Sequence, residues 1–421
     1  MGRHSKVAVL VCALGVAGIG AAQGGQDDSS SSDVFARLRP EYDPNGIHAG
    51  AFTLYPTARS GAGSNSNVFN SSVGVEDYFY SLQSGLKLQS GWSRHELVLQ
   101  AQSKSVWYSN QVTENHTDWD LDAGLRLDLV RGTTLSVDGV YALVHEARGM
   151  DHPGGAETGD AASPTEFTSN ALNAEFEHTF NRMKLIFDGG WNHFDYLDTA
   201  TIGSLLIINN DDRDRTVLHY AGKTSLEIWS DTAIFMRAAM ASTDYTQATD
   251  DNGINRDSDE LVLDGGLQFA ISHVLVGEIA AGLSQKTFVD PSLSETSGAN
   301  VDLKLKWYPS MLTNVTINGG RSNEETTVAG SSGFVATRGG VTVDHELLRN
   351  LILSGQVSYE NDEYAQTLRN DDVLKGGLSG RYLINNNLHL DAGWEFVDRN
   401  SSDTPFAYSS SQFQLSLTGK M

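Results

Sequence analysis

The sequence predicts an all-β protein, a transmembrane antiparallel up-and-down β-barrel of about 18 strands. Three observations lead to this prediction. Apolar and polar residues alternate along most of the chain, short and long breaks separate the alternating segments in strict succession, and the alternation continues to the last residue. No segment beyond the N-terminal region approaches the run of about 18 apolar residues that suggests a transmembrane helix. Strands therefore have to cross the bilayer.

Residues 1–22 have the composition of a signal peptide. Basic residues precede an apolar run over residues 7–19, which closes on Gly-Ala-Ala. This run is shorter than the ~20 residues that a membrane-spanning helix needs. Acylation at Cys12, the alternative of a lipoprotein, would leave only a short stub of the apolar run ahead of the modified residue. We expect cleavage after Ala22 and a mature chain without cysteine.

The chain is acidic, with a net charge of −24 from 53 acidic and 29 basic residues. Charge of this sign repels nucleic acids, which argues against them as partners. Residues 23–48 contain a serine run and few apolar side chains, and we expect them to form a flexible periplasmic leader. Residues 49–421 are then the transmembrane barrel.

Residues 121–129 illustrate the period of two. Leucine or alanine stands at every odd position, and the charged residues, among them Asp122 and Arg126, stand between them. A helix would spread these charges over every face, whereas a strand places them on one side. Residues 261–271 and 301–307 repeat the pattern. The alternation assigns these leucines to the lipid: Leu125, Leu263, Leu303, Leu353 and Leu415.

Two kinds of break separate the strands. The tight breaks are at 91–94, 131–132, 181–182, 230–231, 272–273, 309–310, 349–350 and 385–387. The longer acidic loops are 62–77, 109–117, 148–165, 197–212, 246–257, 288–296, 326–334, 361–371 and 399–406. Eight turns and nine loops connect 18 strands, an even number, as single-chain bacterial barrels require. We expect the acidic loops to face outward and the turns to face the periplasm.

Two other β folds share part of this pattern. A β-propeller has a repeat of about 40 residues, close to the spacing of the tight turns, but each blade needs four short strands where each interval here holds two long ones. A soluble sandwich or secreted adhesin also has sheets with one apolar face. The concentration of long loops on one side favours the barrel.

The last predicted strand alternates from Phe413 to Met421. Outer-membrane barrels typically end in an aromatic residue that the barrel-assembly machinery recognises, and Met421 stands in that place here. We expect this machinery, together with outer-membrane lipid and lipopolysaccharide, to be a partner of the chain.

Several short motifs are distributed over the mature chain. They are Arg39-Pro40-Glu41-Tyr42-Asp43-Pro44-Asn45-Gly46-Ile47, Gly91-Trp92-Ser93-Arg94-His95, Pro164-Thr165-Glu166 and Asp344-His345-Glu346-Leu347-Leu348-Arg349-Asn350. In these motifs the chain resembles outer-membrane β-barrel porins of the beta-barrel porin 2 type. The resemblance covers essentially the whole mature chain and implies a Gram-negative outer membrane. It transfers no catalytic motif, and some related barrels are associated with the export of surface polysaccharide.

No catalytic, cofactor or metal site is predicted. The loop at 250–260 resembles a calcium loop, but Ile254 stands where an oxygen ligand is needed, so we interpret it as a solvated acidic loop. Residues 209–214 are interpreted in the same way. The histidines stand singly along the chain, and we expect no enzymatic role: His95, His145, His193, His273, His345 and His389.

The polar positions of each strand predict the inner wall of the barrel. They carry charges of both signs, which predicts either a solvated wall with internal ion pairs or a selective, polymer-guiding channel. The residues predicted to line the pore are Lys87, Asp122, Arg126, Asp188, Lys223, Arg237, Asp264, Glu278, Lys304, Lys306, Asp391 and Glu395.

Two functions fit these features. The first is a passive, porin-like conduit, with export of a surface polysaccharide and polysaccharide-export proteins as partners. The second is a structural or adhesive surface barrel with a closed lumen and partner-binding acidic loops. Current through a planar bilayer would discriminate between them.

Overall fold

The computed structural model describes residues 33–146, 148, 161–202, 207–272, 274–326, 328 and 330–421. The predicted signal peptide and the first part of the leader, residues 23–32, lie outside the described residues. No helix within the described ranges has the length and apolar character that a membrane crossing requires.

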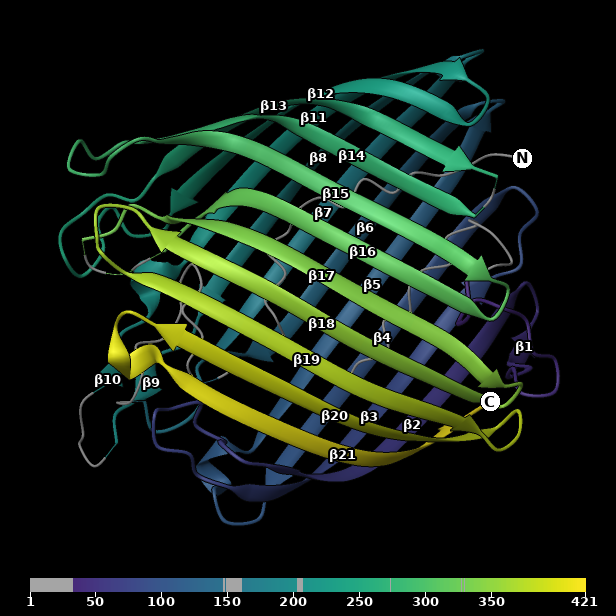
Figure 1. Ribbon diagram of the computed structural model, residues 1–421, viewed down its shortest axis with the longest axis horizontal. Helices are drawn as coiled ribbons and strands as arrows, with labels where there is room; N and C mark the ends of the chain where they lie inside the picture. The colour runs from purple at the N-terminus through teal and green to yellow at the C-terminus, as the bar shows by residue number, and fades with distance from the viewer. Residues whose placement is uncertain are drawn as a thin grey trace.

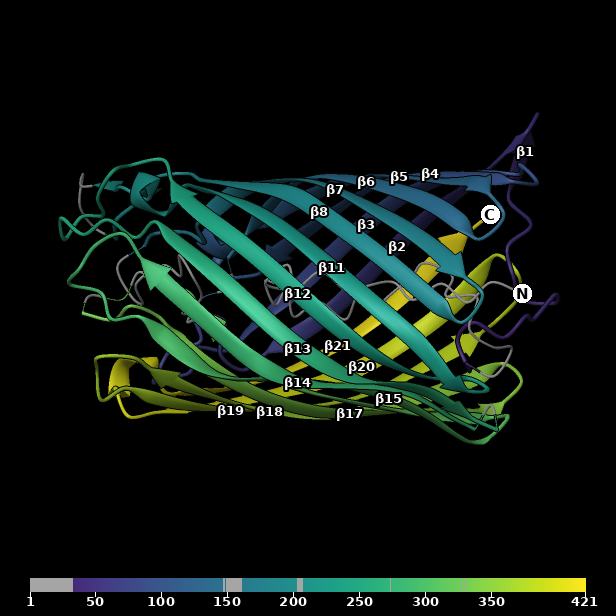
Figure 2. The same ribbon diagram turned by 90° about the horizontal axis from the view of Figure 1, so that it is seen from above.

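Eighteen long antiparallel strands form one closed barrel (Figures 1 and 2). Each pairs with its neighbours along the chain, and β2 pairs with β21 to close the sheet. The predicted architecture is therefore confirmed. The strands are β2 (Phe52–Asn65), β3 (Asp77–Ser90), β4 (His95–Tyr108), β5 (His116–Val130), β6 (Thr133–His145), β7 (Glu166–Phe180), β8 (Met183–Tyr196), β11 (Arg215–Trp229), β12 (Thr232–Tyr245), β13 (Ser258–Ile271), β14 (Leu275–Phe288), β15 (Thr296–Ser310), β16 (Thr313–Glu324), β17 (Phe334–Leu348), β18 (Leu351–Tyr364), β19 (Asn370–Leu383), β20 (Leu388–Ser401) and β21 (Tyr408–Lys420).

The remaining elements are short. β1 (Ile47–Ala49) pairs with β2 at the turn end of the barrel, while β9 (Thr199–Ala200) and β10 (Ile207–Ile208) form a separate pair within a loop. Among the residues that the structure describes, three 3₁₀ turns also lie in loops: η1 (Val112–Glu114), η2 (Asp211–Arg213) and η3 (Thr404–Phe406). The long loops gather at one end of the barrel, and β1 and the C-terminus lie at the other, with the tight turns (Figures 1 and 2).

One predicted break is wrong. Pro309 and Ser310 belong to β15, and the turn consists of Met311 and Leu312. The register with β16 shifts between Trp307 and Ser310, so a bulge accommodates the proline. Proline has no N–H to give to a ladder, and a bulge is one of the few sites in a sheet that tolerates it. The loops predicted at 62–77 and 361–371 are also narrower, because polar residues at their edges still pair in the strands.

Cross-strand pairing separates the two faces of the wall. Residues paired across antiparallel strands point to the same side, so Lys223, Arg237 and Asp264 share one face. The Lys223 ammonium of β11 contacts the Glu278 carboxylate of β14 at 2.8 Å, across two intervening strands. Side chains from strands separated by two others can meet only on the concave side of a closed sheet. This polar face is therefore the inside of the barrel.

The opposite face is apolar. Leu263 of β13 pairs with Leu283 of β14 and Ala238 of β12, and all three point outward. Continued around the barrel, the pairing also places the other four leucines assigned to lipid, Leu125, Leu303, Leu353 and Leu415, on this outer face. A barrel that is apolar outside and polar inside has the distribution that a bilayer requires.

The described part of the leader lies against the inner wall at the turn end. The Arg39 guanidinium contacts the Glu346 carboxylate at 2.7 Å, and only 3% of Arg39 is exposed. The Val34 N–H donates to Asn314 Oδ1 at 3.0 Å, and the ring of Phe35 lies under the Arg381 guanidinium. This segment therefore contacts strands β16, β17 and β19. The domain boundaries at 22 and 48 stay predictions.

Candidate functional site: the inner wall of the barrel

The inner face of the barrel collects all the residues predicted to line a pore. Pairing places Lys87, Asp122, Arg126, Asp188, Lys223, Arg237, Asp264, Glu278, Lys304, Lys306, Asp391 and Glu395 on this face. Their presence along a conducting path stays a prediction.

The structure brings several of these residues into ion pairs along the wall. Lys223 pairs with Glu278 at 2.8 Å and Arg237 with Asp264 at 2.7 Å. Similar pairs join Arg381 to Asp391 at 2.7 Å, Lys304 to Asp302 at 3.0 Å and Arg126 to Asp128 at 3.0 Å. Each pair joins nearby strands or one strand, so the charges lie along the wall. Lys87, Asp122, Asp188 and Glu395 lie on the same face outside these pairs.

The clusters of buried apolar side chains lie at the loop end of the barrel. Among the described residues, two small clusters of buried apolar side chains form: Phe167, Phe194 and Tyr196, and Phe334, Ala336 and Tyr364. Both lie where strands meet the long loops. The wall between the two ends is lined mainly by charged, amide and hydroxyl groups, with a few apolar side chains such as Phe235 and Ile186 among them.

The loop after β16 folds back onto the inner wall. The Glu325 carboxylate of this loop accepts a hydrogen bond from the Lys286 ammonium. It also accepts one from the Tyr245 hydroxyl at 3.2 Å and lies 3.8 Å from the Arg215 guanidinium. Burial alone would raise the pKa of the Glu325 carboxyl, but the Lys286 and Arg215 cations lower that pKa to about 2. Glu325 therefore ties this loop to β11, β12 and β14 as a carboxylate.

The loop at 250–260 is only in part the solvated acidic loop that the sequence predicted, because residues 251–253 are exposed while Asp250 and Arg256 are buried. Asp250 is buried and accepts a hydrogen bond from the Arg256 guanidinium at 2.7 Å. Arg256 also donates to the carbonyl oxygens of Thr326 at 2.6 Å and Ser331 at 3.1 Å. A guanidinium has enough donors to join two loops in this way.

The interpretation of residues 209–214 also needs correction. Arg213 is buried, pairs with the Glu146 carboxylate and stacks over the Tyr196 ring at 4.0 Å. Arg215, the first residue of β11, is also buried, and its guanidinium donates to the carbonyl oxygen of Arg213 at 2.9 Å. Both arginines therefore anchor the loop end of the barrel, where the sequence predicted a solvated acidic loop.

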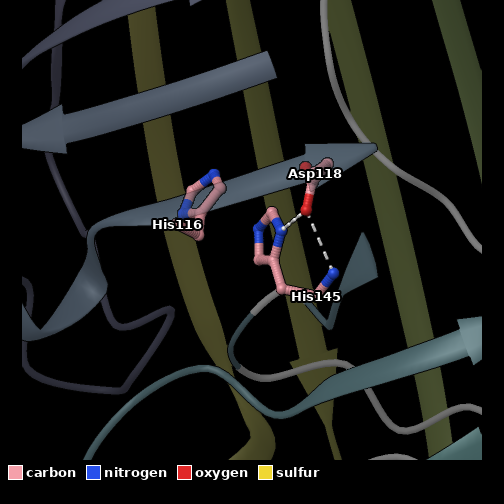
Figure 3. A group of neighbouring side chains, drawn as sticks. All are labelled: His116, Asp118 and His145. Atoms are coloured by element: carbon pink, nitrogen blue, oxygen red, sulfur yellow. Dashed lines mark hydrogen bonds and ion pairs between the residues drawn. The ribbon is translucent and has the colours of Figure 1, made fainter. Parts of the chain in front are cut away.

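Sequence reasoning missed a group of three side chains at the loop end of β5 and β6 (Figure 3). The Nδ1 atom of His145 lies 2.7 Å from Asp118 Oδ1, and the imidazole rings of His116 and His145 stack with centroids 3.5 Å apart. His116 and Asp118 are two residues apart in a strand, which already predicts a shared face. His145 was judged to stand singly because its proximity depends on the β5–β6 register.

The fold and the inner wall together define a class of protein. A closed sheet of 18 strands with an apolar outer face and a polar, charged inner face is the architecture of a porin-like outer-membrane barrel. The chain belongs to the family described as "Putative beta-barrel porin 2", whose model matches residues 39–421. It is a protein of the bacterial outer membrane, and its family is one of porin barrels and not of enzymes.

Structural comparison finds other solved outer-membrane proteins. "Copper transporter OprC" is 10% identical with a TM-score of 0.48, over 90% of this chain and 82% of that one. The siderophore receptor PirA from Acinetobacter baumannii is 6% identical with a TM-score of 0.47, over 87% and 80%. OccK9 (OpdG) from Pseudomonas aeruginosa is 9% identical with a TM-score of 0.46, over 88% and 98%. Similarity this low transfers no property to this chain. No curated protein sequence matches it.

Proposed function

We propose that the barrel is a passive conduit for hydrophilic solutes across the outer membrane. The observation that carries this proposal is the polar inner wall, whose ion pairs, such as Lys223 with Glu278 and Arg237 with Asp264, lie along the wall. Barrels of about 16 to 18 strands enclose an aqueous channel when their interior is polar. Pairing of opposite charges also weakens the net field in the lumen, so selectivity for small ions is weak.

Within this class we propose the export of a surface polysaccharide, with polysaccharide-export proteins as partners. The family resemblance supports this role, and so does the hydrogen-bonding capacity of the wall. Gln83 and Gln102 bond to each other at 2.9 Å on the inner face, and Gln414 donates to Ser81 at 2.9 Å. Amides and hydroxyls of this kind can exchange partners with the hydroxyl groups of a neutral sugar chain.

Reconstitution in a planar bilayer tests the conduit. The purified mature chain should show stepwise, ohmic current with a small reversal potential in a salt gradient. A folded barrel, identified by its heat-modifiable migration, that carries no current contradicts the proposal. A deletion strain tests the polysaccharide role separately: it should lose surface polysaccharide and regain it with the wild-type gene, and unchanged polysaccharide rejects that role alone.

The second candidate, a structural barrel with a closed lumen, is favoured by one specific observation. Segments lie against the inner wall at both ends: the leader through Arg39 and Glu346, and the loop after β16 through Glu325. If these segments fill the lumen, the wild-type barrel is silent in the bilayer and variants that release them conduct. The same bilayer measurement therefore separates the two functions.

A further inference from the structure

The side chains of His116, Asp118 and His145 converge at the loop end of the inner wall (Figure 3). One candidate ligand atom from each residue lies within 4.8 Å of the others. His116 and Asp118 are the first and third residues of β5, and His145 is the last residue of β6. Two rigid strands therefore bring the three side chains together.

Hydrogen bonds set the tautomer of both rings. His145 Nδ1 lies 2.7 Å from Asp118 Oδ1, and His116 Nδ1 lies 2.8 Å from the carbonyl oxygen of Glu114. A carbonyl and a carboxylate oxygen only accept, so each Nδ1 carries the proton and each Nε2 keeps its lone pair. Metal-binding histidines commonly donate their second nitrogen to a carboxylate or backbone carbonyl in this way.

Asp118 is held in place by a second contact. The backbone N–H of His145 donates to Asp118 Oδ1 at 3.2 Å, the same oxygen that the ring contacts. Both bonds go to one carboxylate oxygen, so Asp118 fixes the orientation of the His145 ring. The side chains of His145 and Asp118 are 14% and 12% exposed, so the group keeps some contact with solvent.

The charges around the group limit what can bind. The imidazole rings, with centroids 3.5 Å apart, cannot both carry a proton on Nε2 without strong repulsion. Lys104 stands opposite Asp118 in the β4–β5 register, and Glu114 is already paired with Arg148 at 2.7 Å. Because Lys104 competes for the carboxylate, the two neutral imidazoles supply most of the affinity.

We propose that His116 Nε2 and His145 Nε2 bind one divalent transition-metal ion of the Zn²⁺ type, with the Asp118 carboxylate orienting the ring of His145 through its Nδ1. Imidazole nitrogen suits Zn²⁺, Cu²⁺ and Ni²⁺, whereas Ca²⁺ and Mg²⁺ prefer all-oxygen sites. The sequence predicted no metal site, because it could not show that His145 meets the other two residues. The proposal is independent of the conduit, since binding does not require conduction.

Isothermal titration of the full mature chain, folded in detergent and free of any affinity tag, tests the site with Zn²⁺. The wild-type chain should bind one ion, and His116→Gln and His145→Gln should each weaken binding at least tenfold. Asp118→Asn should weaken it about 10- to 100-fold, because the carboxylate orients His145. Heat-modifiable migration shows that each variant is folded.

The matched control is His389→Gln. His389 is also an inner-wall histidine next to a carboxylate, with Nε2 3.2 Å from Asp391 Oδ2, but among the described residues no third metal-ligating side chain joins this pair. Its variant should bind Zn²⁺ like the wild-type chain. The proposal is wrong if folded His116→Gln and His145→Gln retain wild-type affinity, if the wild-type chain binds no ion, or if His389→Gln loses binding to the same extent.

Co²⁺ gives a second readout that depends on the ligands. Bound to the two imidazoles, it should show visible d–d absorption that disappears in His116→Gln and persists in His389→Gln. Absorption that is unchanged in His116→Gln places the ion elsewhere and overturns the assignment.

Discussion

Leu263 and Asp264 are neighbours in β13 and point to opposite sides of the barrel wall. Leu263 is 51% exposed among other apolar side chains, whereas Asp264 is 6% exposed and accepts a hydrogen bond from Arg237 on the inner face. A shift of one residue in the β12–β13 register would exchange the two faces along the whole strand. The assignment of one face to lipid and the other to the lumen can therefore be tested by the stability of variants on each face.

Leu263→Arg should destabilise the folded barrel. An arginine on the lipid face near the midplane costs roughly 2 to 4 kcal/mol in the free energy of unfolding, because the charge enters hydrocarbon. Urea unfolding in lipid vesicles measures the effect. Asp264→Arg is an unsuitable control, since it would put two cations together where Asp264 now pairs with Arg237.

Thr342→Arg is the matched control for this experiment. Thr342 lies in the middle of β17, pairs with Thr316 and Gln356, and points inward. Its replacement by arginine should change the free energy of unfolding by less than about 1 kcal/mol, as is usual for a solvated site. Equal effects of Leu263→Arg and Thr342→Arg would contradict the assignment of the two faces.

Surface labelling tests which end of the barrel faces outward. Asp251 lies exposed in the loop between β12 and β13, and Asn386 lies in the turn between β19 and β20. External loops are long and periplasmic turns are short in bacterial barrels. A membrane-impermeant maleimide should therefore label Asp251→Cys on intact cells, and Asn386→Cys only after permeabilisation. Reversed labelling would invert the topology.

The alternation of apolar and polar residues was enough to predict the strands and the two faces, because a strand exposes that period directly. It could not show how loops fold back, since the contacts of Arg256 with Thr326 and Ser331 join segments about 70 residues apart. The alternation also could not predict the contact between His116 and His145. That contact depends on side-chain geometry at the end of a strand pair, where periodicity carries no information.

The carboxyl of Glu325 should make the stability of the barrel depend on pH in acid. Its pKa falls to about 2 in the folded chain, below the ordinary value near 4.3. The unfolded chain therefore binds the proton more tightly between these values. The stabilisation is fully present above about pH 4.3 and is lost as the pH falls toward 2. Its size at neutral pH is on the order of 3 kcal/mol.

Glu325→Gln removes this titration while preserving the shape of the side chain. Its free energy of unfolding should lie below that of the wild-type barrel at pH 7, and the difference should shrink between about pH 4 and pH 2.5. Glu363→Gln, which changes an exposed carboxylate in β18, is the control and should follow the wild-type curve. A constant difference between Glu325→Gln and the wild-type chain over this range would refute the role of the carboxylate.

Arg39→Ala should release the leader from the inner wall. The Arg39 guanidinium contacts Glu346 at 2.7 Å and the Val34 carbonyl oxygen at 2.7 Å, and both Arg39 and Glu346 are buried. Loss of one partner from a buried ion pair costs about 3 to 5 kcal/mol, since the other charge stays buried. We expect faster proteolysis within residues 33–46 and, in a conducting barrel, a higher single-channel conductance.

Arg37→Ala is the control that separates the loss of the buried Arg39 contacts from the loss of one positive charge in the leader. Arg37 lies 3.4 Å from the same Glu346 carboxylate, but 25% of its side chain is exposed, so its contribution is that of a surface pair, about 0 to 1 kcal/mol. Its proteolysis rate and conductance should stay close to wild type, although it removes the same charge from the same segment. If both variants release the leader equally, net charge holds the segment in the barrel. If the leader stays protected from proteolysis in Arg39→Ala, the contacts of Val34 and Phe35 with the wall are sufficient to hold the leader.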